Sequence, residues 1–254
     1  MVLISSLVLA STASVAVAQE GTLPPTFTSD RPGFANTTGV AAREHLTAEM
    51  GVSASFGDTP SGALPNLSLR TGLFDWLEAR VRGPSAAGVF PASGAVFGMS
   101  DPSLGFKVGG RLADSLTMSL DWEVSLPLGT TGFGAPEATF FADLNADWNF
   151  WGPLTLTPNL VASVLADVDA TTGETVRWFE GGGSLKLTWQ VIEVLGLFVQ
   201  GYAIASERAD LRVTIGGGIY WMVAPNVQVD ASFDAGVTDG GDPPTVGLGT
   251  TILF

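Results

Sequence analysis

The chain has 254 residues, of which 14% are charged and 32 are glycine, and its mean hydropathy is +0.34. This composition is too apolar for a disordered chain. The net charge of −14 argues against nucleic acid as a partner, because nucleic acid binds clustered positive charge. The chain has no cysteine, and its single histidine, His45, leaves no histidine pair for zinc, so we expect no metal and no cofactor.

Residues 1–18 resemble a secretory signal peptide. An apolar stretch ends in Ala16-Val17-Ala18, which is typical of a cleavage site, and cleavage after Ala18 would export the chain. The alternative, an uncleaved anchor helix, is disfavoured by the hydroxyl side chains within this short segment. Beyond it, we find no run of about 20 consecutive apolar residues, the length that a membrane-spanning helix needs.

From residue 44 onward, apolar and polar residues alternate, which is the pattern of β-strands with one apolar face. In residues 44–56, for example, Leu46, Ala48 and Met50 alternate with Thr47, Glu49 and Gly51. The alternation predicts twelve strands, over residues 44–56, 67–73, 77–82, 103–111, 116–126, 140–148, 154–168, 176–189, 195–205, 211–223, 227–237 and 245–254.

The predicted connections alternate between tight turns and longer loops rich in glycine, proline or charge. The long ones include residues 83–100, 127–136 and 238–244. Short turns at one end, longer loops at the other and an even strand number are typical of an outer-membrane barrel. Five tryptophans lie at or near the tight turns, where an interfacial aromatic girdle is expected: Trp76, Trp148, Trp151, Trp189 and Trp221.

The position of the charges separates a membrane barrel from a soluble one. Nearly all strand charges share the register opposite the apolar side chains. The apolar side of all twelve strands carries more bulk than one closed interior needs, so we expect it to face lipid, with the charges in the lumen. The fold class is therefore an all-β, transmembrane, antiparallel up-and-down β-barrel of about twelve strands. We expect the lumen to be lined by Arg70, Glu78, Arg80, Lys107, Asp121, Glu123, Asp143 and Asp230.

The expected lumen charges are divided by sign along the chain. The early strands carry cations (Arg70, Arg80, Arg82, Lys107 and Arg111), and the following strands carry anions (Asp121, Glu123, Asp143, Asp147 and Asp167). One interpretation is an internal network of salt bridges. The other is a transverse field that orients polar solutes in a channel, and the two are compatible.

Residues 19–43, ahead of the first strand, form either a plug inside the barrel or a disordered periplasmic tail. The plug candidates are Asp30, Arg31, Pro32 and Phe34. We therefore divide the chain into a signal peptide (1–18), a periplasmic or plug segment (19–43) and a barrel (44–254). A twelve-stranded barrel holds a narrow passage or a plug, since eight strands are filled by side chains and sixteen leave a water channel.

Several segments resemble, in the same order, the transporter-like outer-membrane barrels known as putative MetA-pathway of phenol degradation proteins. They are Ser29-Asp30-Arg31-Pro32-Gly33-Phe34, residues 69–78, 101–107, 125–129, 157–160 and 216–230. The resemblance spans most of the mature chain. It implies passage of small molecules, with aromatic or hydrophobic compounds as a candidate class, across the outer membrane of a Gram-negative bacterium.

The sequence thus favours an outer-membrane channel or transporter for small molecules that is not an enzyme. The alternative is a non-conducting structural or surface-binding barrel. Hydrolysis of lipid is disfavoured, because His45 lies on the lumen register, whereas a lipid hydrolase needs its base at the lipid-facing wall. The expected partners are outer-membrane lipid, a small-molecule solute and the barrel-assembly machinery, which would recognise the terminal strand ending at Phe254.

Overall fold

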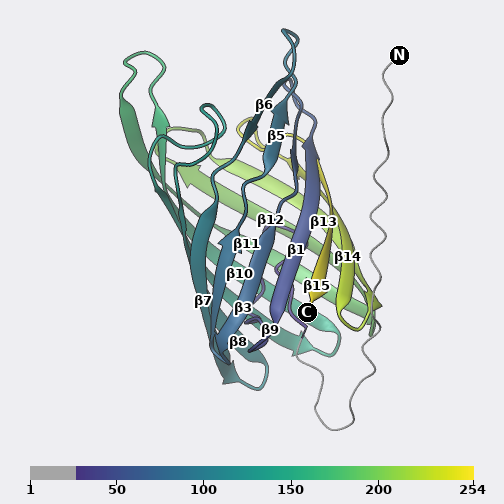
Figure 1. Cartoon of the computed structure of the whole chain (residues 1–254). Coiled ribbons are helices and arrows are strands. Elements are labelled where there is room, and N and C mark those ends of the chain that lie inside the picture. The colour runs from purple at the N-terminus through teal and green to yellow at the C-terminus, as the bar shows by residue number, and fades with distance from the viewer. Residues whose placement is uncertain (1–26) are drawn as a thin grey trace, which may run out of the picture.

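The computed structural model describes residues 27–254 and shows a closed antiparallel β-barrel (Figure 1). The predicted signal peptide, 1–18, lies outside the described residues, as does 19–26. Within the described part of the chain, no helix is long and apolar enough to cross a membrane. The barrel strands are β1 (Leu46–Ser55), β3 (Ser68–Phe74), β4 (Leu77–Arg82), β7 (Ser103–Ala113), β8 (Leu116–Ser125), β9 (Thr139–Trp151), β10 (Leu154–Val168), β11 (Thr175–Ile192), β12 (Leu195–Ser206), β13 (Arg212–Ala224), β14 (Val227–Gly236) and β15 (Thr245–Leu253).

Each of these twelve strands pairs with its neighbours in chain order, and β1 closes the barrel by pairing with β15. The β1–β15 register runs from Thr47 opposite Leu253 to Ser55 opposite Thr245. Turns of two residues join β3 to β4, β7 to β8, β9 to β10, β11 to β12 and β13 to β14. All of these turns lie at one end of the barrel, the turn end, and the longer connections lie at the other, the loop end (Figure 1). The prediction of a twelve-stranded up-and-down barrel is confirmed.

Three short strands that the sequence pattern placed in loops extend the sheet at the loop end. They are β2 (Ser61–Leu64), β5 (Ala86–Val89) and β6 (Val96–Met99), which pair in the order β1–β2–β5–β6. Each is separated from a barrel strand by a break that contains a proline: Pro65, Pro84 or Pro102. Proline has no N–H for the strand ladder, so the ladder stops at each break and resumes after it.

Apolar side chains lie on the outer face of the barrel wall and polar ones on the inner face, the reverse of their placement in a soluble protein. Leucine, phenylalanine and tryptophan are exposed along the outer face, for example Leu120, Phe140 and Leu185. The largest fully buried side chains are instead polar, and among them are Arg70, Glu78, Arg80 and Lys107. A broad exposed apolar surface around a charged interior is stable in lipid and not in water. The five tryptophans expected near the turns are all exposed.

Candidate functional site

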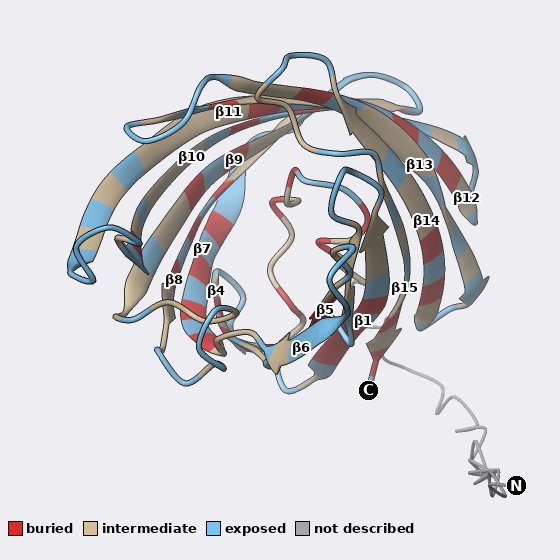
Figure 2. Cartoon of the chain, turned by 90° about the horizontal axis from the view of Figure 1, so that it is seen from above, coloured by how far each residue is buried: buried red, intermediate tan, exposed pale blue. Residues whose placement is uncertain are grey.

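A stretch ahead of β1, the inner segment (residues 29–41), runs through the interior of the barrel (Figure 2). Its backbone and side chains form hydrogen bonds with eleven of the twelve barrel strands. Ser29 reaches Thr251 on β15, for instance, and Asn36 reaches Asp121 on β8. Only a segment inside a closed wall can contact side chains on nearly every strand of that wall.

Asp30 is the most highly connected residue of the inner segment. Its carboxylate lies 2.7 Å from Lys107 Nζ and 3.0 Å from Arg80 Nη2, and Arg70 Nε is 3.7 Å away. Its backbone N–H donates to Glu49 at 2.9 Å. Burial raises the pKa of Asp30, but the charges of Arg70, Lys107 and Arg80 lower it by more, so this pKa lies well below its ordinary value. Asp30 is therefore a carboxylate anion bound to three strands.

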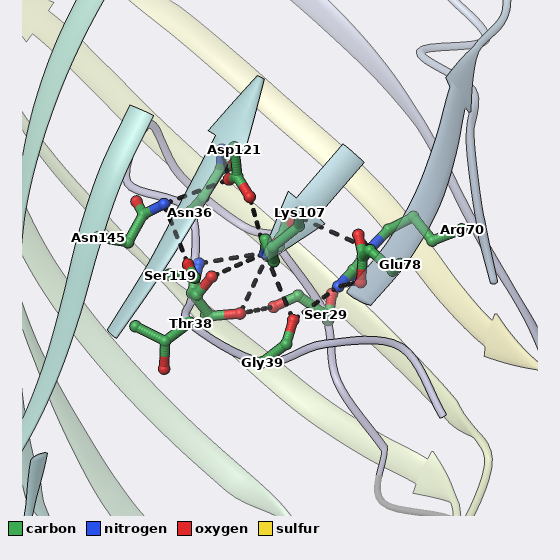
Figure 3. A network of polar contacts seen from close by, with 12 residues as sticks. Ser29, Asn36, Thr38, Gly39, Arg70, Glu78, Lys107, Ser119, Asp121 and Asn145 are labelled. Atoms are coloured by element: carbon green, nitrogen blue, oxygen red, sulfur yellow. Dashed lines mark hydrogen bonds and ion pairs between the residues drawn. The ribbon is translucent and has the colours of Figure 1, made fainter. Parts of the chain in front are cut away.

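Around Asp30, charges of opposite sign alternate in a central ion-pair network, part of which is drawn in Figure 3. Glu78 lies 2.9 Å from Arg70 Nε and 2.6 Å from Arg80 Nη2. Arg80 reaches Glu123 at 3.3 Å, and Asp121 lies 3.6 Å from Arg80. The network comprises Asp30, Glu49, Arg70, Glu78, Arg80, Lys107, Asp121 and Glu123, all of which are buried. Its three bases each contact two or more of its five acids, and Glu123 also pairs with Arg82 at 2.9 Å, so each buried charge has a partner of opposite sign.

Backbone groups of the inner segment join the same network. The Ala41 N–H donates to Glu78 at 2.6 Å, and the Gly39 carbonyl accepts from Arg70 Nη2 at 3.0 Å. Lys107 Nζ donates to the Thr37 carbonyl at 2.8 Å. The wall charges thus bind the main chain of the inner segment as well as Asp30, which fixes its path through the barrel.

Further anchors lie on the remaining strands. Arg31 forms a bidentate pair with Asp230 on β14, and the Phe34 ring stacks on Tyr202 of β12 with 4.1 Å between ring centroids. Asn36 donates to Asp121 and to Asp143 at 3.0 and 3.1 Å. Pro32 lines a cavity at the turn end of the barrel. Each of the four plug candidates therefore lies inside the barrel wall.

The eight expected lumen residues do not form one group. Arg70, Glu78, Arg80, Lys107, Asp121 and Glu123 meet in the central network. Asp143 lies beside it and accepts hydrogen bonds from Asn36 and Asn159, whereas Asp230 is apart from it and pairs with Arg31.

Two of the other charges predicted to lie in the lumen are on the inward register of their strands but are not enclosed, so their placement in the lumen is wrong. Arg111 is exposed at the end of β7 and bonds to Asp114 in the adjoining turn, and Asp167 is exposed near the end of β10. Alternation predicts which side of a strand a residue faces, but not how far that residue lies from the ends of the barrel. Charges at strand ends are therefore exposed even when they face inward. Within residues 27–254, no group of three or more His, Cys, Asp and Glu residues is arranged to hold a metal ion.

Several uncharged residues that hold the inner segment were not singled out from the sequence. The Gln200 side chain accepts from the Phe34 N–H at 3.0 Å, and Asn159 donates to the Asn36 carbonyl at 3.3 Å. Thr251 contacts Ser29 with 2.7 Å between the hydroxyl oxygens. All three side chains share the register of the buried charges, so a search of that register for amides and hydroxyls would have found them.

The inner segment separates two cavities in the barrel. The loop-end cavity has a volume of about 570 Å³ and is lined by residues such as Phe34, Arg82, Ser100 and Phe141. The turn-end cavity has a volume of about 500 Å³, and its lining includes Thr117, Thr155 and Gln190. The interior is therefore hollow from both ends, and the inner segment lies between the two cavities.

The family model described as "Putative MetA-pathway of phenol degradation" matches residues 29–254. The chain belongs to this family. The match begins at Ser29, so it includes the inner segment as well as the barrel. Among curated protein sequences, no significant match was found.

Solved structures of outer-membrane proteins share the fold of this family member. An outer membrane channel from Pseudomonas putida F1 aligns with a TM-score of 0.72 at 10% identity, over 85% of this chain and 98% of that chain. The NanC porin aligns with a TM-score of 0.57 at 10% identity, over 82% and 98%. The KdgM porin in complex with disordered oligogalacturonate gives 0.53 at 7% identity, over 83% and 99%. At these identities the likeness establishes the outer-membrane barrel fold.

Proposed function

We propose that the protein is a passive channel that carries small molecules across the outer membrane of a Gram-negative bacterium. The observation that carries this proposal is the pair of cavities that enter the barrel from opposite ends. In this proposal the turn end faces the periplasm and the loop end faces the outside, as is usual for such barrels. The Pseudomonas putida protein of the same fold is itself described as an outer membrane channel.

Residues 19–43 act as the plug of this channel, and residues 44–254 form the conducting barrel. Support comes from the contacts of Asp30 with Lys107 and Arg80, which hold the inner segment across the interior. The lining of the passage comprises Arg70, Glu78, Arg80, Lys107, Asp121, Glu123, Asp143 and Asp230. Because most of these charges are paired with one another or with the inner segment, they hold the plug in place.

Small aromatic or hydrophobic compounds are the proposed solutes. The loop-end cavity combines apolar side chains, among them Phe34, Leu67 and Phe141, with serine hydroxyls and with charged groups such as Arg82 and Asp101. Such a lining offers apolar contact to the ring of a phenol, and its hydroxyl and charged groups can hydrogen-bond with the phenol hydroxyl, which both donates and accepts. The family description, which refers to phenol degradation, agrees with this class.

Liposome swelling tests the channel directly. We expect the folded protein to raise the swelling rate above that of control liposomes, and to raise it by more in phenol than in an amino acid or a sugar of matched osmolarity. Liposomes with heat-unfolded protein serve as the control. If no solute enters faster than in the control, the protein is instead a non-conducting structural or surface-binding barrel, which the paired and buried interior charges would also suit.

The remaining assignments complete the proposal. A signal peptide at residues 1–18 exports the chain, outer-membrane lipid surrounds the exposed apolar wall, and the assembly machinery recognises the terminal strand through the exposed Phe254.

We assign no enzymatic activity. His45 Nδ1 lies 2.8 Å from the Arg43 carbonyl oxygen, an arrangement that provides no serine nucleophile for the imidazole to activate.

A further inference from the structure

Three residues form a row across the inner face of β14, β15 and β1. Asp230 on β14 pairs with Gly249 on β15, and Gly249 pairs with Gly51 on β1. Directly paired residues point to the same face of a sheet, so all three positions face the interior. Two of them have no side chain. The seam at which the barrel closes therefore has a bare patch of backbone beside a single carboxylate.

The guanidinium of Arg31 occupies this bare patch. Its Nε and Nη2 donate to the two Asp230 oxygens at 3.1 and 2.9 Å. A Cβ atom at Gly51 would lie 2.6 Å from Arg31 Nη1, and one at Gly249 would overlap the guanidinium. The Asp230 side chain is fully buried and that of Arg31 is 19% exposed. The two glycines thus provide the space that Arg31 needs to reach its carboxylate.

Arg31 also lies between the two cavities. Among the described residues, it is the one that lines both the loop-end and the turn-end cavity. The other side of the inner segment is bound to the wall by Asp30, Asn36 and Thr38. On the side of β14, β15 and β1, the wall has two glycines in place of larger side chains. There the Arg31 side chain separates the loop-end cavity from the turn-end cavity.

We propose that Arg31 is the gate of the passage: its side chain closes a path along β14, β15 and β1, and solutes pass there when the guanidinium leaves Asp230. This inference rests on the proposed channel function and adds where the path runs and what closes it. The inner segment itself need not leave the barrel, because its Asp30 anchors are independent of the Arg31 pair.

Single-channel recording in planar bilayers, under a KCl gradient, tests the gate. In Arg31→Ala, the two cavities join and the Asp230 carboxylate faces the path. We expect a conductance at least about twofold above that of the unaltered protein and a reversal potential shifted toward cation selectivity, because an exposed acid in a pore attracts cations. The double variant Arg31→Ala/Asp230→Asn should keep the higher conductance and lose the shift.

Two further variants sharpen the test. Gly249→Ala leaves Arg31 in the chain but fills the space that its guanidinium occupies beside Gly249. This variant should therefore also raise the conductance. Arg111→Ala removes an exposed arginine at the turn end and should change nothing. Heat-modifiable mobility on gels identifies the folded barrels, and Arg31→Ser, which also removes the side-chain bulk, replaces Arg31→Ala if the latter does not fold.

The outcomes separate this inference from the channel proposal. If deletion of residues 19–43 raises the conductance while Gly249→Ala and the folded small variant at position 31 (Arg31→Ala or Arg31→Ser) match the unaltered protein, the path runs elsewhere and the gate is refuted. If the deleted barrel also carries no current, the channel proposal fails, and the gate fails with it.

Discussion

Deleting residues 19–43 should raise the single-channel conductance severalfold. The deletion removes the inner segment and so joins cavities of about 570 and 500 Å³ into one continuous lumen. Twelve strands lie between the eight that side chains fill and the sixteen that leave a water channel, so we expect the unplugged lumen to hold water. The measurement is conductance in planar bilayers, with residues 1–18, the proposed signal peptide, kept in the expressed chain.

A shorter deletion provides the control for this experiment. Removing residues 19–26 alone retains every contact of the inner segment from Ser29 onward, so the conductance should equal that of the unaltered protein. Equal conductance of the long deletion and the unaltered protein would refute the plug.

Replacing Glu78 with alanine should have the largest effect on stability of the single substitutions considered. The Glu78 side chain is fully buried, and its oxygens accept from Arg70, Arg80 and the Ala41 N–H. Its removal breaks three contacts in the buried network and leaves N–H groups of both guanidiniums unpaired, although Arg70 keeps Glu49 and Arg80 keeps Asp30. Breaking a buried pair in this way typically costs about 3–5 kcal/mol. Urea unfolding of the protein in lipid vesicles, followed by tryptophan fluorescence, measures the change in the free energy of unfolding.

Glu137→Ala is the matched control, because Glu137 also pairs with an arginine, Arg177, but on the exposed surface. Such exposed pairs contribute about 0–1 kcal/mol. If Glu78→Ala and Glu137→Ala lower the free energy of unfolding equally, the central network is not what stabilises the interior.

The wall of the barrel could be predicted from the sequence because it follows a local rule. Alternation at period two assigns each strand residue to a side, and this works over long strands such as β11 and β12. The rule failed for β2, β5 and β6, which are four residues each and interrupted by nearby prolines. In those segments too few residues alternate to distinguish a strand from a loop.

The interior could be predicted only in part. The register identified Arg70, Glu78 and Lys107 as inward, but not what they contact. Asp30 lies 77 residues from Lys107 in the chain, and no local pattern relates them. The position of the Arg31 side chain was even harder to predict from the sequence. It depends on Gly51 facing Gly249, and this register exists only once the first and last strands pair. The inner segment is not part of a strand, so its contacts with distant residues become apparent only in the closed barrel.

The central claim, that the inner segment lies inside the barrel, is tested most directly by one disulfide. Ser29 and Thr251 have their hydroxyl oxygens 2.7 Å apart, and the chain has no native cysteine. Cysteines at these two positions should bond in isolated outer membranes, because their side chains already meet at bonding range. Cysteines at Ser29 and Thr250 should stay reduced, since Thr250 faces the other side of β15. Quantifying the disulfide by gel shift gives the result, and a Ser29–Thr251 pair that stays reduced would contradict the account.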